Sequence, residues 1–532
     1  MKYKFVLPDK QIESEAMKPF EIYRVHIRPA LEQKRAALDA MYDPVMGRPE
    51  MDPVILMGVS ILQIMERLPD RQAVWACLYD VRWRLALGLP CDWQGFDPSS
   101  LVYFRKRVIQ NDQAKLALDA ALDAMRKTGY LKIRGPVRID STHILAAVAH
   151  LSRLECVRET LRLTLDFLSA FGGSAKWEPW FSRYASRNPK ELHNPSAERL
   201  KATMNQAGED ARDILLKTKK MGKKISESDP VLLLQRVFEE QFAETAAQEV
   251  VQLRASPSGS VHSPHDPDAT WSTKGSLGKA GWVGSKLQVC ETAPEINRQK
   301  GEPTEAVITA VMLQPAITSD HGSIAPVLAA HMSLGQEAPA TVFSDAGYIS
   351  APALKKAEDD GYELCGPMPA PPYGAKRFGS DSFEVDTSRR QAVCPAGKSN
   401  STCAFITESR SKASYYYFTW SHSDCKSCHL QCQCLSKKQQ SFRTLQVGKL
   451  HMFGQARRQL CRSEDYQRRM HRRSGVEGTN SELKRGYGLR CTRYRGNAKT
   501  NLQSIFTATA CNIRRWSARL RWLDRENSKQ CV

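Results

Sequence analysis

The sequence predicts an α/β fold whose strand-bearing core is interrupted twice and is preceded by a helical region. Apolar residues recur at helical spacing through the first 130 residues, and the pattern changes at Val137 to the alternation that is typical of a strand. Two later stretches, 150–256 and 375–445, differ in composition from the strand regions beside them. One core with two insertions is the simplest architecture with this order of elements.

Length and charge narrow the possible functions. The chain has 532 residues, which is too long for one ordinary hydrophobic core, so we expect several domains. Apolar residues make up 42% and charged residues 25%, as in a globular protein. The formal net charge is +20, from 77 Lys and Arg against 57 Asp and Glu. This excess favours a polyanionic partner, most simply nucleic acid.

No segment suggests secretion or a membrane. The N-terminal stretch lacks an uninterrupted apolar run, and the most apolar segment, 53–65, is too short to cross a bilayer. We therefore expect a cytoplasmic protein with no membrane partner. Its 15 cysteines should then be reduced thiols or metal ligands.

The first region predicts three helices. Apolar residues at helical spacing mark the first, around 53–65. Asp70 is placed to cap a second, and Ser99 or Ser100 a third that covers 101–125. The pattern predicts an N-terminal helical domain, 1–130, as a candidate for DNA binding or dimerisation, although it has no specific helix-turn-helix signature.

The core strands follow. The stretch 137–144 (VRIDSTHI) alternates as a strand does, and the insert 150–256 returns to helical patterns at 154–168 and 229–253. After a loop, 281–292 and 305–316 predict two neighbouring strands. The stretch 340–350 predicts another, broken at Asp345, and Ser350 is placed to cap the helix after it.

Two aspartates lie where predicted strands end. Two metal ions about 3.5–4 Å apart require carboxylates that converge from different elements, because Mg²⁺ prefers hard oxygen ligands. Asp140 and Asp345 suit this arrangement, and Gly347 lets the backbone turn away after the second.

Glu477 is the helical candidate for a third ligand. At about 100° per residue, Lys484 lies roughly 20° from Glu477 around the helix axis, whereas Glu482 points roughly 140° away. Ser481 shares the face of Glu477, and Arg473 joins it if the helix extends back that far. Gly475 and Gly478 weaken the helix there, and Ser474 is an alternative cap.

Each carboxylate taken alone also has a purely structural interpretation. Asp140 could cap a strand end, the Asp345 stretch could be a plain turn, and Glu477 could form a surface pair with Arg473. Together, and in this order along a basic chain, they favour a metal site.

The same stretches resemble a known family. VRIDSTHI, VFSDAGY and the block with Arg473, Glu477 and Lys484 are similar to the three catalytic blocks of bacterial insertion-sequence DDE transposases. Met470 stands where that family's signature has a tyrosine. Residues 51–89 and 96–108 resemble the family's N-terminal helical domain.

The resemblance implies an RNase H-like catalytic core, residues 131–522, with the helical insert 150–256 and the Cys-rich insert 375–445. It implies that Asp140, Asp345 and Glu477 bind two Mg²⁺ ions, with Asp320 as the leading substitute for either aspartate. The reaction implied is hydrolysis at the element's ends, followed by attack of the freed 3′-OH on target DNA. The partners would be the element's terminal inverted repeats and target DNA, bound by a homodimer or a larger assembly.

The Cys-rich insert is a candidate zinc site. Cys394, Cys425, Cys428 and Cys434 could close a tetrahedral structural site. A single CxxC leaves unmetallated thiols equally open, and the candidate replacements are Cys403, His422, His429 and Cys432.

The last segment is strongly basic. Its candidate DNA contacts are Arg473, Lys484, Arg485, Arg490, Arg493 and Arg495, which suit a phosphate backbone. A solvated charged surface is the alternative. Two other functions also stay open: an RNase H-like nuclease that cuts without joining, and a non-catalytic zinc-bearing DNA-binding protein from a decayed element.

Overall fold

In the computed structural model, the described residues are 17–43, 51–90, 92–148, 151–185, 196–245, 249–253, 255–273, 281–295, 301–369, 377–409, 413–435 and 441–530. Within this part of the chain, no helix is both long enough and apolar enough to cross a membrane.

A mixed six-stranded sheet forms the centre of the molecule. Its strands follow the order β4-β5-β1-β7-β8, and β6 pairs with β5 on the edge that β4 also uses. The strands β4, β5, β6 and β1 are joined by antiparallel pairing, whereas β7 and β8 run parallel to β1. The bounds are β1 Val137–Leu145, β4 Thr270–Ser272, β5 Trp282–Thr292, β6 Ile308–Pro315, β7 Thr341–Phe343 and β8 Glu363–Cys365. The four predicted strands are present as β1, β5, β6 and β7, but β1 continues past Asp140 to Leu145, and β7 covers only three residues of the stretch 340–350.

Helices cover both faces of this sheet. Helices α15 (Ile324–Met332) and α16 (Ala351–Asp359) pack against one face, in a cluster that includes Ile139 and Cys290. Helix α22 (Asn497–Gln530) contributes to a second cluster, which takes Leu287 and Val289 from β5. Successive side chains of a strand point to opposite faces, so the two clusters lie on opposite sides of β5.

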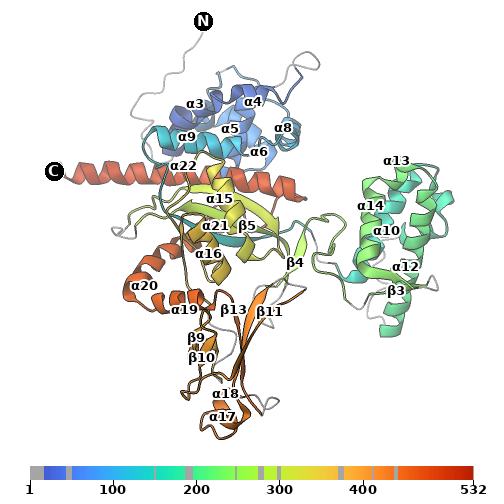
Figure 1. Cartoon of the computed structure of the whole chain (residues 1–532). Coiled ribbons are helices and arrows are strands. Elements are labelled where there is room, and N and C mark those ends of the chain that lie inside the picture. The colour runs from blue at the N-terminus through green and yellow to red at the C-terminus, as the bar shows by residue number, and fades with distance from the viewer. Residues whose placement is uncertain are drawn as a thin grey trace.

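The N-terminal helices pack on the outer side of α22 (Figure 1). One hydrophobic cluster runs from Tyr23 through α5 to Trp516 on α22 and on to the sheet, so these helices share a core with it. Their bounds are α2 Lys18–Ile22, η1 Tyr23–Ile27, α3 Arg28–Glu32, α4 Arg35–Asp39, α5 Pro53–Glu66, α6 Asp70–Tyr79, α7 Val81–Leu87, α8 Ser99–Gln110 and α9 Leu116–Lys127.

Three local predictions in this region are wrong. The stretch 101–125 forms parts of α8 and α9, because the chain turns at Asp112, which has a positive φ of 52°. Asp70 does not cap α6: its carboxylate accepts hydrogen bonds from Arg105 and Gln63 instead. Ser99 and Ser100 are the first two residues of α8 and make no side-chain cap either.

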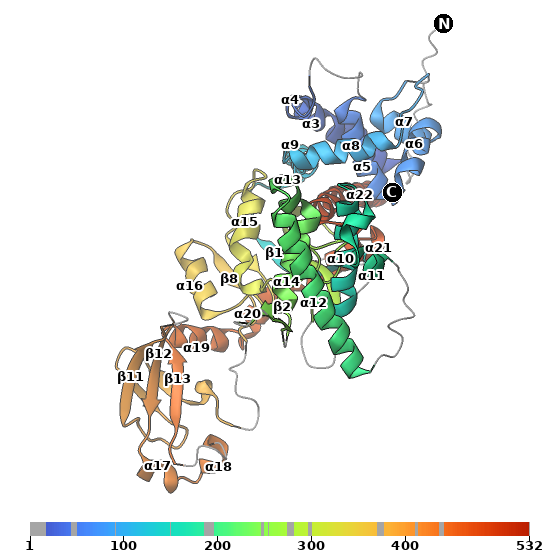
Figure 2. The same ribbon diagram turned by 90° about the vertical axis from the view of Figure 1, so that its right-hand side faces the viewer.

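The insert after β1 forms a helical unit with its own hydrophobic cluster, and it projects from the side of the sheet (Figures 1 and 2). Its helices are α10 Arg153–Ser169, η2 Ser174–Trp177, α11 Trp180–Ala185, α12 Ala197–Lys219, α13 Lys223–Ser226 and α14 Asp229–Gln241. The second predicted helix ends early, because β2 (Phe242–Glu244) and β3 (Val250–Gln252) pair as a hairpin. Gly208 on α12 makes room for Phe242 and Val250 of that hairpin.

The Cys-rich stretch forms a small β module, which also has its own cluster and extends away from the sheet (Figure 1). It contains a two-stranded and a three-stranded antiparallel sheet. The elements are η5 Ser380–Ser382, β9 Glu384–Asp386, β10 Gln391–Val393, β11 Thr402–Thr407, β12 Ser414–Thr419, α17 His422–Lys426, α18 Gln431–Cys434 and β13 Thr444–Gly448.

The chain then returns to the sheet. Helices α19 (His451–Leu460) and α20 (Glu464–Met470) and the turn η6 (His471–Ser474) lead into α21 (Gly475–Gly486) and then α22. Helix α21 lies against β1 and β5. It begins where the sequence suggested, but Ser474 does not cap it, because its hydroxyl donates to the carbonyl of His471.

Candidate active site

Asp140 and Asp345 lie at the same level of neighbouring parallel strands. Arg138 of β1 pairs with Phe343 of β7, and each aspartate comes two residues later in the chain. Asp345 follows the end of β7, whereas the prediction that Asp140 ends its strand is wrong, because pairing with β5 continues β1 to Leu145. Adjacent strands are about 4.8 Å apart, so the backbones at the two aspartates are close. Both side chains are half-buried. The structure therefore brings these two predicted residues together.

Asp320, the predicted substitute, lies beside Asp345. A Cβ atom at Gly347 would stand 3.0 Å from Asp345 Oδ1 and 3.6 Å from Asp320 Oδ2, so both carboxylates approach the same glycine. Asp320 also accepts hydrogen bonds from Lys286 Nζ at 3.1 Å and Gln288 Nε2 at 3.2 Å. Asp345 is held by its own turn, because its Oδ1 accepts from Gly347 N at 2.8 Å.

The hydroxyl of Tyr348 is close enough to the three aspartates for their charges to affect its pKa. It is buried and donates to Gln288 Oε1 at 2.5 Å. Burial raises the pKa of Tyr348, and the charges of Asp320, Asp140 and Asp345 raise it further. Three carboxylates thus act on one point, as expected where cations bind.

Helix α21 places Asn480 on Asp140. The amide Nδ2 of Asn480 donates to Asp140 Oδ2 at 2.9 Å. Glu477 is one turn earlier on the helix, but it does not reach the aspartates here. Its side chain is 62% exposed and pairs with Arg473 at 3.4 Å. Its role as a metal ligand remains a prediction.

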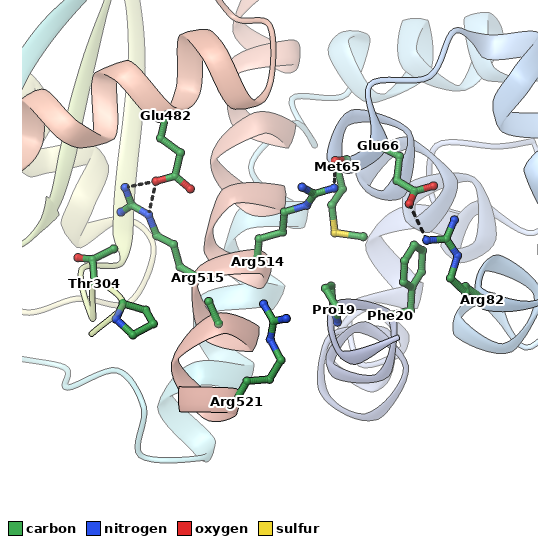
Figure 3. A pocket seen from close by; sticks show the side chains of 12 residues that line it. Pro19, Phe20, Met65, Glu66, Arg82, Thr304, Glu482, Arg514, Arg515 and Arg521 are labelled. Atoms are coloured by element: carbon green, nitrogen blue, oxygen red, sulfur yellow. Dashed lines mark hydrogen bonds and ion pairs between the residues drawn. The ribbon is translucent and has the colours of Figure 1, made fainter. Parts of the chain in front are cut away.

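Glu482 is directed elsewhere, in agreement with the helical phase. Its carboxylate accepts from Arg515 Nη2 on α22 at 2.8 Å (Figure 3). The pair borders a pocket of about 520 Å³ between α22 and the N-terminal helices. Glu482 is therefore a structural partner of α22, and the choice of Glu477 as the helical metal ligand stays a prediction.

Met470, at the position of the family's tyrosine, packs in a small cluster with Phe343 and Cys365. Tyr466, four residues earlier on α20, belongs to the same cluster, and its hydroxyl donates to the carbonyl of Gly366 at 3.1 Å.

The basic segment after α21 forms backbone hydrogen bonds with the last residue of β1. Leu145 N donates to Arg490 O and Leu145 O accepts from Thr492 N, both at 2.9 Å. Leu145 is five residues beyond Asp140, or about 17 Å along the strand. Of the predicted DNA contacts, the exposed ones are Arg485, Arg490, Arg493 and Arg495. Arg473 and Lys484 are half-buried.

The N-terminal helices support this segment. Arg493 Nη1 donates to the carbonyl of Leu68 at 2.9 Å, and the guanidinium of Arg105 lies 5.5 Å from the centre of the Tyr494 ring. Tyr494 is thus part of this packing. The arginines around it project from a surface that the fold holds in place.

The four predicted thiols line one small pocket in the β module. Cys394 lies in a tight turn after β10, Cys425 and Cys428 lie in and just after α17, and Cys434 ends α18. Burial raises the pKa of Cys434, and the other three sulfurs raise it further. His422, His429 and Cys432 are exposed and do not line this pocket, and neither does Cys403.

Neither the carboxylates at the sheet nor the thiols of the β module are already arranged as a metal site. Among the residues that the structure describes, no three His, Cys, Asp or Glu side chains form a group that could hold a metal ion. The donor types still match the predicted ions: hard carboxylate oxygens suit Mg²⁺ at the sheet, and thiols suit Zn²⁺ in the β module.

Comparison with known families decides the class of protein. Residues 393–517 match the family described as a transposase DDE domain, and residues 12–107 match a transposase domain. The two domains indicate a transposase. They also confirm the resemblance to insertion-sequence DDE transposases, and the mixed α/β fold is consistent with it. A search of curated proteins and a search of solved structures gave no match.

The two transposase matches include only some of the predicted site residues. The DDE match includes Glu477, Lys484 and the four thiols, whereas Asp140 and Asp345 lie outside both matches. The assignment of these aspartates therefore depends on the geometry of the sheet.

Sequence reasoning missed two polar residues of this region, Asn480 and Tyr348. Asn480 lies about 60° around the helix from Glu477, so the helical phase that selected Glu477 could have found it. Tyr348 follows the turn at Asp345 and looked like one more apolar position of a strand.

Proposed function

We propose that this chain is a DNA transposase that cleaves phosphodiester bonds at the ends of its own element and joins the freed 3′-OH to target DNA. Two ends must meet for this reaction, so the proposal includes assembly of a homodimer or larger complex on DNA. The observation that carries it is that Asp140 on β1 and Asp345 just after β7 lie at the same level of two adjacent parallel strands, with α21 packed across β1.

We also propose that the core is RNase H-like. The antiparallel strands β6, β5 and β1, followed by the parallel strands β7 and β8, support this assignment. Helices on both faces of the sheet agree with it. Both aspartates then lie on the two central strands, where α21 can reach them.

The residues have separate roles in this proposal. Asp140, Asp345 and Glu477 would hold two Mg²⁺ ions, which would activate the attacking oxygen and stabilise the leaving oxygen. Lys484, on the same helix face as Glu477, and Arg473, in the turn η6 just before the helix, would bind the phosphates on either side of the bond. Catalysis then depends on positioning and charge, with no covalent protein nucleophile.

Glu477 must leave Arg473 to take this role, and the cost is small. An exposed i,i+4 pair on a helix is worth about 0.3–0.5 kcal/mol. Their pair is exposed at the carboxylate and long at 3.4 Å. A divalent cation at the aspartates would outweigh it, and Arg473 would then be released for a phosphate.

We further propose that Cys394, Cys425, Cys428 and Cys434 bind a structural Zn²⁺. The thiolate form is costly in this pocket, because burial raises the pKa of Cys425 and Cys434 and the neighbouring sulfurs add to the effect. A divalent cation would reverse that balance by stabilising the thiolates.

The test of the main proposal uses a duplex that carries the element's end, supplied with Mg²⁺. We expect Asp140→Asn, Asp345→Asn and Glu477→Gln each to abolish cleavage and strand transfer while retaining DNA binding. The matched control is Glu358→Gln on α16, because Glu358 is equally exposed, at 64%, and also forms a surface helix pair. The control should react as the wild type does.

Other outcomes would point to the rival functions. Cleavage by the wild type without any joined product would indicate a nuclease. Binding without cleavage by every variant and the wild type would indicate a DNA-binding protein. Normal joining by Glu477→Gln would remove Glu477 from the site.

A further inference from the structure

Asn480 combines two features that the proposed site does not yet explain. Its side chain is nine-tenths buried, with an exposed fraction of 8%, and its Nδ2 donates to Asp140. Its Oδ1 is also buried and has no hydrogen-bond partner among the described residues. A buried acceptor without a partner costs about 1–3 kcal/mol, so its retention at this point calls for a reason.

The chemistry of the amide suits a carboxylate that must bind a cation. An amide can donate to Asp140 without adding a second negative charge or neutralising the first. It restrains one carboxylate oxygen, Oδ2, and thereby the rotamer of the side chain. Lys or Arg at the same point would compete with a metal ion for the carboxylate.

A buried ion cluster fixes the height of Asn480 above the sheet. Both oxygens of Glu291 are used: Oε1 accepts from Arg138 Nε at 2.6 Å, and Oε2 accepts from Thr479 Oγ1 at 2.7 Å. Arg138 lies two residues before Asp140, and Thr479 directly precedes Asn480. One carboxylate therefore connects the strand of Asp140 to the helix of Asn480.

Helix α22 completes the same cluster. Arg515 Nη1 donates to Glu291 Oε2 at 2.9 Å, and Arg515 Nη2 donates to Thr479 Oγ1 at 2.6 Å. Arg138, Glu291 and Arg515 are all at most 5% exposed at the side chain. Buried ion pairs add little net stability compared with apolar packing, and fixing a register is their best-attested use.

The start of α21 is fitted to this cluster as well. Arg138 Nη1 donates to the carbonyl of Arg472 at 2.9 Å. A Cβ at Gly475 would come within 2.0 Å of the same nitrogen, so only glycine lets the helix approach this closely. The helix is thus held at both ends of the contact with β1.

We propose that Asn480 is a positioning residue that orients Asp140 for metal binding, with the Glu291 cluster holding it in place. This inference rests on the proposed function, because it concerns the same carboxylate. Asn480 touches Asp140 and not the DNA in this account. In this account its buried, unpartnered Oδ1 accepts a hydrogen bond from water that enters with the metal.

The test measures metal binding directly. Mn²⁺ is titrated into the full chain with end duplex, and free Mn²⁺ is followed by electron paramagnetic resonance. We expect Asn480→Ala and the volume-conserving Asn480→Leu to weaken Mn²⁺ binding by about 10–100-fold, the usual effect of losing an outer-sphere partner. Affinity for the duplex without metal should stay unchanged.

The matched control is Asn512→Ala on α22. Asn512 is also buried, and its amide accepts from Ile308 N and donates to Ile308 O, on a strand that is separated from β1 by β5. We expect this variant to lower the melting temperature at least as much as Asn480→Ala does, without weakening Mn²⁺ binding. A merely structural role for Asn480 would make the two variants behave alike.

Asp140→Asn, measured in parallel, distinguishes failure of the proposed metal site from failure of the inference about Asn480. If Asp140→Asn binds Mn²⁺ as the wild type does, the proposed carboxylate site fails. If Asp140→Asn loses Mn²⁺ but both folded Asn480 variants bind it normally, only the inference about Asn480 is overturned.

Discussion

At the scale of single residues, the carboxylates of the candidate site differ in how firmly they are held. Asp140 is restrained by Asn480, and Asp345 by the amide of Gly347 in its own turn. Among the described residues, Glu477 forms only a long surface pair with Arg473, and its side chain is mostly exposed. We therefore expect the two aspartates to define the site and Glu477 to close it when cation and DNA arrive.

The exposed arginines beside β1 give a residue-scale prediction about DNA. We expect Arg490→Ala and Arg495→Ala each to lower the slope of log affinity against log salt by about one, because each removes one phosphate contact. The loss should be the same for end duplex and unrelated duplex, since phosphate contacts carry no sequence information. Fluorescence anisotropy at several salt concentrations measures both.

The control for this experiment is Arg389→Ala, an arginine that is 79% exposed in the turn between β9 and β10. An equal loss from this substitution would mean that DNA binding is spread over the whole basic surface. The segment after α21 would then lose its special role.

Single residues also show what the sequence could and could not reveal. Helical phase separated Glu477 from Glu482, and Arg515 on α22 indeed holds Glu482. Asp320 was recognisable only as a substitute, because its approach to Asp345 depends on the turn at Gly347. No local pattern could show that Glu291 bonds Arg138, since their pairing arises from strand register.

At the scale of elements, strands with clear alternation were predictable, but boundaries set by tertiary packing were not. The break between α8 and α9 occurs at Asp112, in a stretch whose apolar spacing continues as if it were one helix. The β2–β3 hairpin replaces the end of a predicted helix because Phe242 and Val250 find a place against Gly208. The hairpin therefore depends on a contact with a helix glycine that lies more than 30 residues earlier in the sequence.

The β module gives an element-scale prediction about zinc. We expect about one Zn²⁺ per purified chain by mass spectrometry, as four thiolate ligands would hold one ion. Cys425→Ser or Cys434→Ser should lose the ion and destabilise the module, because a structural metal contributes directly to folding. Limited proteolysis within 377–448 would detect that loss.

Cys432→Ser is the matched control, because Cys432 belongs to the same segment but is exposed and does not line the pocket. It should retain the metal. A purified wild type that contains no zinc, and whose module resists proteolysis equally after treatment with a chelator, would contradict the assignment.

At the scale of the whole molecule, the structure comprises one continuous core and two separate units. The N-terminal helices, α22 and the sheet share a single hydrophobic cluster, which the order of elements in the sequence did not reveal. The helical insert and the β module have clusters of their own and project away from the sheet (Figure 1). The carboxylates, the ion cluster and the basic segment all belong to the continuous core, so we expect the core to carry the chemistry.

The central claim is that Asp140, Asp345 and Glu477 form one metal site. The most direct measurement is a structure of the chain bound to end duplex and a divalent cation. We predict that the Glu477 carboxylate leaves Arg473 and joins both aspartates around cations about 3.5–4 Å apart, beside a phosphate of the DNA. A structure in which Glu477 still pairs with Arg473, while Asp320 binds the cation in its place, would contradict the account.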